Sequence, residues 1–63
     1  MKLIRFEDIH GKETFINADR LNFICDYQSG TTELNFGSKD AVVYVEMEVS
    51  AVAKTLLKAT TEK

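Results

Sequence analysis

The stretch Phe15–Ile24, FINADRLNFI, sets Asn17 and Asp19 between two apolar runs. Asparagine and aspartate side chains bond to backbone N–H groups two residues further on, which competes with sheet pairing and favours a tight turn. We therefore predict that this stretch is a joint between two strands and not a binding site. Three apolar residues are expected to fill the core on either side of it: Phe15, Leu21 and Phe23.

Toward the N-terminus, two short apolar-rich segments flank a polar patch. Residues 2–7 hold Leu, Ile and Phe with charged residues between them, and residues 8–12 form the patch. Its glycine, Gly11, can adopt the positive φ that a tight hairpin needs. The pattern predicts a strand over residues 2–7, a hairpin loop, and a second strand from about Glu13 to Ile16.

Toward the C-terminus, residues 21–27 and 31–36 alternate apolar and polar residues with the period of two that is typical of strands. We expect the apolar face of the first of these strands to carry Leu21, Phe23, Cys25 and Tyr27, with Ile24 as the lone apolar residue on the other face. The second strand places Thr32, Leu34 and Phe36 on one face. Ser29-Gly30 and residues 37–40 supply the turns between strands.

Residues 41–45 form a continuous apolar run, which indicates a strand buried on both faces and the most central of the sheet. Beyond Glu46 the apolar period changes to 3.6, which predicts an amphipathic helix of about three turns. Its stripe consists of Val49, Val52, Ala53 and Leu56. The fold class is therefore α+β and mainly β: five short antiparallel strands in a bent sheet or half-open small barrel, closed by one C-terminal helix. A plain meander followed by a helix is the alternative.

The chain has 63 residues, no proline and no internal repeat, so we expect residues 1–63 to form a single domain without a linker. A domain of this size buries only roughly 60% of the surface that its unfolded chain exposes. The single Cys25 and the lack of a metal-ligand cluster remove the usual staples of very small domains. We therefore expect a second chain to complete the core and to supply the stability that these staples usually provide.

Charge and hydropathy exclude several classes of protein. The net charge is −2, the sequence pI is about 5.2, and lysine and arginine are scattered, so nucleic-acid binding is disfavoured. No run approaches the roughly 18 apolar residues of a membrane span, and the N-terminal residues lack a signal-peptide core. We expect a cytoplasmic protein without a membrane span, which agrees with one unpaired cysteine.

No set of residues indicates catalysis, a cofactor or a metal, so we expect a protein that is not an enzyme. His10 beside Asp8 provides two possible ligands, whereas zinc sites take three or four from protein, and a metal here would need a second protomer. His10 is therefore interpreted as a solvated turn residue. Cys25 shares its expected strand face with apolar residues and lies far along the chain from the only histidine, which favours a structural thiol over a nucleophile.

The last strand and the helix carry more apolar surface than one thin sheet can cover, which is typical of association surfaces. The predicted interaction residues are Val42, Tyr44, Met47 and Leu57. Because an antiparallel sheet of this size also has free edges, we predict self-association, most simply as a homodimer with two-fold symmetry, or binding to another protein. The alternative is a small-barrel nucleic-acid-binding or phage-type regulatory protein, in which scattered basic residues and aromatics form a stacking platform.

Several short motifs occur in a recognisable order. They are K-L-x-R at residues 2–5, Gly11-Lys12, F-I-N-A-D at residues 15–19, Phe23-Ile24 and T-x-L-x-F-G-x-K at residues 32–39, followed by a valine strand and a short helix. In this order the sequence resembles the FlbD family, whose small proteins are encoded with flagellar genes. The resemblance implies a small cytoplasmic protein that supports flagellar motility without a catalytic motif.

Overall fold

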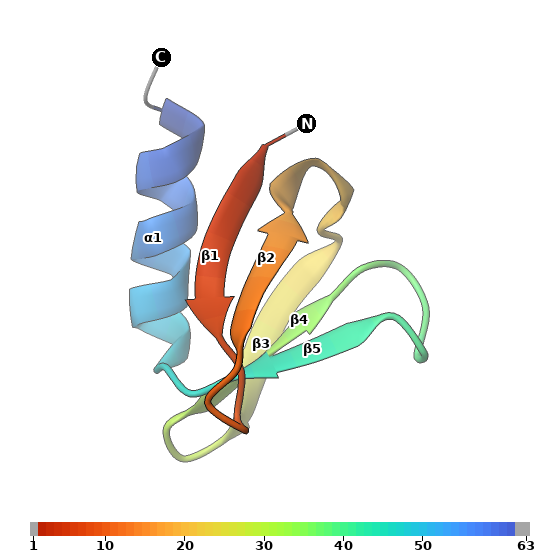
Figure 1. The fold of residues 1–63 in the computed structure, drawn as a ribbon, viewed down its shortest axis with the longest axis vertical. Helices are drawn as coiled ribbons and strands as arrows, with labels where there is room; N and C mark the ends of the chain where they lie inside the picture. The colour runs from red at the N-terminus through yellow and green to blue at the C-terminus, as the bar shows by residue number, and fades with distance from the viewer. Residues whose placement is uncertain (1, 62–63) are drawn as a thin grey trace.

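The computed structural model describes the backbone of residues 2–61 and the side chains of residues 2–59. Within them the chain forms five strands, one turn of 3-10 helix and one α-helix (Figure 1). In chain order these are β1 (Leu3–Glu7), β2 (Glu13–Asn17), the 3-10 turn η1 (Ala18–Arg20), β3 (Phe23–Gln28), β4 (Thr31–Asn35), β5 (Val42–Val45) and α1 (Val49–Thr61). The predicted class, mainly β with a C-terminal helix, is confirmed.

The strands form two small antiparallel sheets, the β1-β2 hairpin and the three-stranded sheet β3-β4-β5. An isolated bridge between Asp8 and Val45 joins them, and the Ile9 N–H donates to the Tyr44 carbonyl at 3.1 Å. In Figure 1 the hairpin stands across the three-stranded sheet with α1 alongside. Together the two sheets form a bent and open arrangement of strands. Among the described residues no ladder joins β3 to the hairpin, so the strands do not close into a barrel.

The core lies on one face of the three-stranded sheet. Its buried apolar residues are Ile4, Phe6, Ile16, Leu34, Val45 and Val52. Leu34 on β4 lies opposite Ile24 on β3 and Val43 on β5, and both of these half-buried residues pack against the core. Val52 of α1 and the inward residues of the hairpin complete it. The helix and the hairpin therefore cover the same face of the sheet.

The most central strand is β4, and the prediction that residues 41–45 are the most central was wrong. β4 lies between β3 and β5, and four of its five residues are buried, whereas only Val45 is buried on β5. Apolar composition missed this because β4 buries polar side chains that have hydrogen-bond partners. The Thr32 hydroxyl donates to the Met47 carbonyl at 2.7 Å, and the Asn35 carboxamide accepts from the Gly37 N–H at 2.8 Å.

The core face predicted for β3 was also wrong. Phe23 and Tyr27 are 49% and 54% exposed, and Phe15 on β2 is 57% exposed. Ile24, the residue predicted to be the apolar exception, turns toward the core beside Leu34. A period of two separates the two faces of a strand but does not say which one is buried when both carry apolar residues.

The predicted joint between β2 and β3 is confirmed as the 3-10 turn η1. The Asn17 side-chain oxygen accepts the Asp19 N–H at 3.1 Å, and the Leu21 N–H donates to the Ala18 carbonyl at 3.2 Å. The Ala18 N–H in turn donates to the Lys2 carbonyl at 2.8 Å, which fastens the turn to the start of β1. Asn17 therefore acts as an N-cap.

We expect Asn17→Ala to lower the free energy of unfolding by about 0.5–2 kcal/mol, because the substitution removes the cap of the Asp19 N–H. Urea denaturation followed by circular dichroism measures the change. Asn22→Ala, at an exposed position just beyond the turn, is the matched control and should stay within about 0.5 kcal/mol of the parent. Equal losses for the two variants would contradict the capping role.

Candidate functional site

The face of the three-stranded sheet turned away from the core is uncovered by other described elements. Strand register places Cys25, Glu33 and Tyr44 in one row across it, and Phe23, Asn35 and Val42 in the next. We use the term open face for Phe23, Cys25, Tyr27, Glu33, Val42 and Tyr44. Its exposed aromatic residues are the side chains that the sequence pattern assigned to the core.

An aromatic pair lies on the open face. The rings of Tyr27 and Tyr44 have centroids 4.6 Å apart and planes inclined at 50°, a tilted stack that joins the two outer strands across β4. A β-bulge between Asp26 and Gln28 supplies the irregular register that precedes the turn into β4. Partial burial raises the pKa of the Tyr44 phenol above its ordinary value, and the negative charge of Glu33 beside it raises it further.

A shallow groove of about 250 Å³ lies where the hairpin loop meets the edge of β5. Its lining residues are Asp8, Ile9, His10, Thr14, Val42, Val43 and Tyr44. Ligand pockets for small molecules have volumes of about 300–1,000 Å³ and enclose most of the ligand, so this open groove is a poor fit for one. It extends the apolar surface of Tyr44 and Val42 toward the exposed Ile9.

The Asp8 carboxylate organises the hairpin loop. One oxygen, Oδ1, accepts the backbone N–H groups of His10 and Lys12, each at 2.9 Å, while Gly11 turns the chain with φ of 78°. The exposed His10 contributes its backbone to this turn. In the described part of the chain, no three residues among His, Cys, Asp and Glu lie close enough to hold a metal ion.

The hydrogen bond from the Lys12 N–H, more than any other contact, lowers the pKa of Asp8 below its ordinary value. A carboxyl group with a lowered folded-state pKa contributes stability that is present above its unfolded-state pKa, about 3.9, and is lost as the pH falls through the folded-state pKa. We therefore expect the stability difference between the parent and Asp8→Asn to shrink as the pH falls from about 6 to about 2. Thermal melts across that range measure it, and a difference independent of pH would contradict the role of the carboxylate.

The structure places the predicted interaction residues in three environments. Val42 and Tyr44 lie together on the open face, Met47 is half-buried and packs against the core, and Leu57 is 64% exposed on α1, which covers the opposite face of the sheet. They do not form one patch. Sequence reasoning missed Phe23 and Tyr27 as surface residues, and the signal that could have found them was Ile24, whose presence gives both faces of β3 an apolar side chain.

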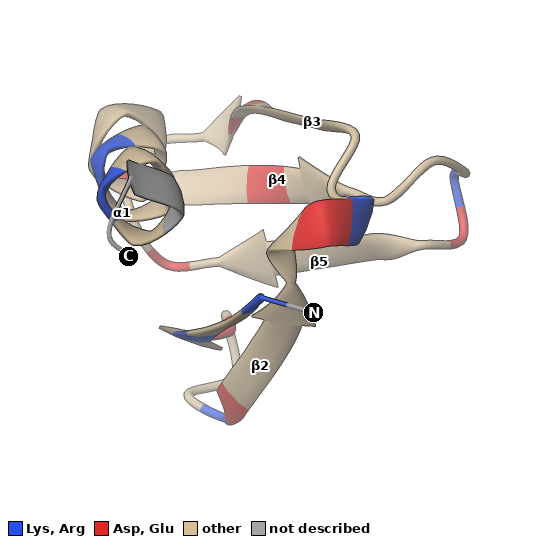
Figure 2. Cartoon of the chain, turned by 90° about the horizontal axis from the view of Figure 1, so that it is seen from above, with Lys and Arg blue, Asp and Glu red and all other residues tan. Residues whose placement is uncertain are grey.

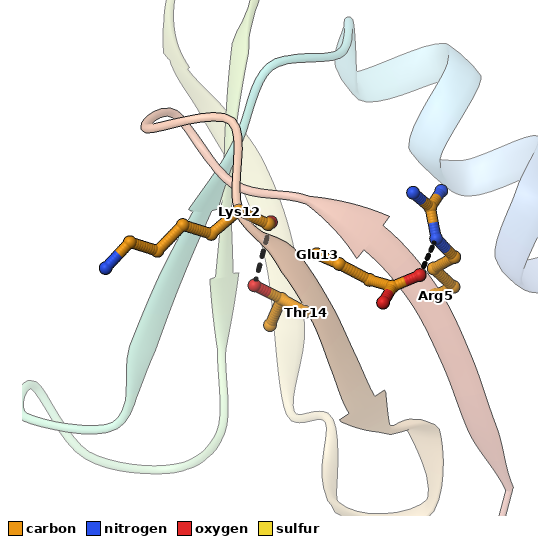
Figure 3. Close-up of polar contacts among 4 residues, drawn as sticks. All are labelled: Arg5, Lys12, Glu13 and Thr14. Carbon is orange, nitrogen blue, oxygen red and sulfur yellow. Dashed lines mark hydrogen bonds and ion pairs between the residues drawn. The ribbon is translucent and has the colours of Figure 1, made fainter.

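Charges of both signs are intermixed along the chain, with basic and acidic segments next to each other at several turns (Figure 2). On the outer side of the hairpin, Arg5 Nε donates to a carboxylate oxygen of Glu13, and both side chains are about half exposed (Figure 3). The Thr14 hydroxyl donates to the Lys12 carbonyl at 3.3 Å nearby. Solvent-exposed ion pairs of this kind add little to stability.

Comparison with known proteins gives no match to this chain, whether by family, among curated proteins or among solved structures. The one α-helix of the described residues, α1, is too short and too polar to cross a membrane. The site is therefore characterised by its own geometry: an uncovered apolar sheet face that carries an aromatic pair.

Proposed function

We propose that this protein is a non-enzymatic interaction or assembly module that acts as a homo-oligomer through the β3 side of the three-stranded sheet, where the exposed Phe23 and Tyr27 of the open face lie. The observation that carries the proposal is the exposure of Phe23 and Tyr27 beside Tyr44 on a sheet face without a cover among the described elements. Aromatic side chains are enriched at protein interfaces because each buries a large area in a rigid shape.

Sedimentation equilibrium of the full chain over about 5–500 µM tests the proposal, a range chosen because small interfaces commonly have micromolar dissociation constants. We expect a mass that rises with concentration toward twice that of the chain. A mass of 7.1 kDa across the whole range would contradict self-association.

We predict that Phe23→Ser weakens self-association at least about tenfold, because the substitution removes an aromatic side chain from the open face of both copies. Phe15→Ser is the matched control: this phenylalanine is similarly exposed but lies on the outer face of the hairpin. Sedimentation measures both dissociation constants, and melting temperatures confirm that both variants are folded. Equal effects of the two substitutions would move the interface away from the open face.

A nucleic-acid-binding or phage-type regulatory protein is the second candidate, favoured by the Tyr27–Tyr44 pair, because aromatic side chains on an open sheet can stack with bases. Glu33 on the same face and Asp26 on the edge strand oppose it by repelling phosphates. A gel shift with single-stranded oligonucleotides at low salt separates the candidates, since phosphate-driven binding must weaken as salt rises.

The cellular setting that we propose is that of a motility accessory protein in the cytoplasm, from the motifs that resemble the FlbD family, FINAD at residues 15–19 and TELNFGSK at residues 32–39. The buried Ile16, Leu34 and Asn35 and the turn residue Asn17 belong to these motifs, so much of the resemblance lies in positions that shape the fold. Flagellar genes beside the coding sequence would support this setting, and phage genes there would contradict it.

A further inference from the structure

The three-stranded sheet has an unpaired edge along β3. Its ladder runs to β4, and within residues 2–61 no ladder runs along its other side. One hydrogen bond shows which residues of β4 direct their backbone groups toward β5 and which toward β3. The Phe36 N–H donates to the Ala41 carbonyl at 2.8 Å, so residue 36 faces the side of β5. By strand alternation, residues 33 and 35 of β4 direct their backbone groups toward β3, so those of Phe23 and Cys25 face β4.

The backbone N–H and C=O groups of Ile24 and Asp26 consequently face outward from the edge. An edge strand of this kind is a template for another strand. Charge, proline and shortness commonly protect such edges; β3 has six residues, FICDYQ, with one charged side chain and no proline. The bulge protects only its last residues.

We propose that β3 of a second copy of this chain pairs with this edge, antiparallel, about a two-fold axis that passes between the two Cys25 residues. This inference rests on the proposed self-association and assigns its geometry. Ile24 of each copy lies opposite Asp26 of the other in hydrogen-bonded pairs, and the two Cys25 residues face each other in the non-hydrogen-bonded pair between them. Phe23 of each copy then lies alongside Tyr27 of the other on the shared open face.

The outward-facing backbone groups permit three registers, with the two-fold axis at Ile24, Cys25 or Asp26. The charge of Asp26 and the overlap between the two β3 strands favour the axis at Cys25. A two-fold axis at Asp26 sets two carboxylates directly opposite each other, which is destabilising. An axis at Ile24 sets Phe23 against Cys25 and leaves Tyr27 beyond the end of the partner's β3. The axis at Cys25 separates the two carboxylates, and each exposed aromatic of β3 gains an aromatic neighbour.

The same geometry predicts the strength of the contact. A standard stable interface buries about 800 Å² on each partner, more than one short strand edge and two partly exposed aromatics provide. The pair is therefore expected to be weak, with a dissociation constant in the micromolar range. Pairing of the two β3 strands joins the three-stranded sheets of the two copies into one continuous six-stranded sheet. The two open faces then lie side by side and form one aromatic surface.

Cys25, the only cysteine of the chain, reports directly on this register. In a non-hydrogen-bonded antiparallel pair the Cα atoms are about 4.5 Å apart, within the roughly 4.4–6.8 Å that a disulfide spans. Diamide oxidises two thiols to one disulfide and takes up the two protons and two electrons as it becomes the hydrazine. At a concentration where sedimentation finds dimer, we expect the cross-linked dimer to form at least about tenfold faster than in the double variant Cys25→Ser/Ser38→Cys, whose thiol lies in an exposed loop.

A backbone variant provides the second measurement. Asp26→Pro removes an outward-facing N–H while leaving the residues that face β4 unchanged, and we expect at least about a tenfold rise in the dissociation constant relative to Asp26→Ala. Circular dichroism and melting temperature show whether both variants are folded, with midpoints expected within about 4 °C of each other. If the proline variant does not fold, the cross-linking rates decide.

The outcomes separate this inference from the proposed function beneath it. A chain that is monomeric at every concentration overturns both. A dimer that cross-links no faster than the loop-cysteine control, or that forms equally well in the folded Asp26→Pro variant, overturns the β3 pairing and leaves self-association through another part of the surface. Fast cross-linking together with loss of the dimer in Asp26→Pro supports both.

Discussion

Leu34→Ala is expected to lower the free energy of unfolding by about 2–5 kcal/mol, the largest effect of any substitution considered. Leu34 has no exposed surface and lies on the central strand between Ile24 and Val43. The truncation removes buried methyl groups and leaves a cavity that the neighbouring strands cannot fill without losing their pairing. A domain of this size has a total stability of about 3–9 kcal/mol, so the substitution removes a large fraction of it.

Urea denaturation followed by circular dichroism measures this loss. Leu57→Ala is the matched control, because the same atoms are removed from a side chain that is 64% exposed on α1. It should change stability by less than about 0.5 kcal/mol. A loss below about 1 kcal/mol for Leu34→Ala would mean that this residue is not at the centre of the core.

Thr32→Val is expected to lower the free energy of unfolding by about 1–3 kcal/mol, although valine has nearly the same shape. The Thr32 hydroxyl donates to the Met47 carbonyl at 2.7 Å, and the residue has no exposed surface. Valine removes the donor and leaves the carbonyl of a loop residue without this partner. The bond ties β4 to the connection that leads into α1, so its loss also loosens the approach of the helix.

The matched control is Thr55→Val within α1. The Thr55 hydroxyl donates to the Ala51 carbonyl at 3.0 Å, but that carbonyl also has the helical N–H four residues on as a partner. Thr55→Val should therefore cost less than about 0.5 kcal/mol. Urea denaturation of the two variants gives the comparison, and similar losses would show that the Thr32 hydroxyl bond has no special importance.

Local signals predicted the elements of this fold well. Alternation with a period of two and short apolar runs located the strands to within about two residues at each end, a change of period located α1, and Asn17 marked the joint. These features depend on interactions between residues close in sequence. The central position of β4 depends on which strands become neighbours, and Thr32 and Asn35 concealed it because buried polar residues resemble surface residues in a sequence.

The candidate site was only partly predictable for the same reason. Val42 and Tyr44 were predicted as association residues because the last strand and the helix carry more apolar surface than a thin sheet can cover, and the structure places both on the open face. Phe23 and Tyr27 were assigned to the core, since the register that turns Ile24 inward is set by Leu34 on the neighbouring strand. Pairing between strands, and not composition, decided which side of β3 meets water.

The bridge between Asp8 and Val45 has a consequence for how far assembly extends. It places the hairpin loop at the Val45 end of the β5 edge, where the Ile9 N–H donates to the Tyr44 carbonyl. A three-stranded sheet with both edges open is a monomer for a fibril, because each added copy presents a fresh template. With the hairpin loop in the way at the β5 edge, we expect the proposed pairing through β3 to stop at two copies.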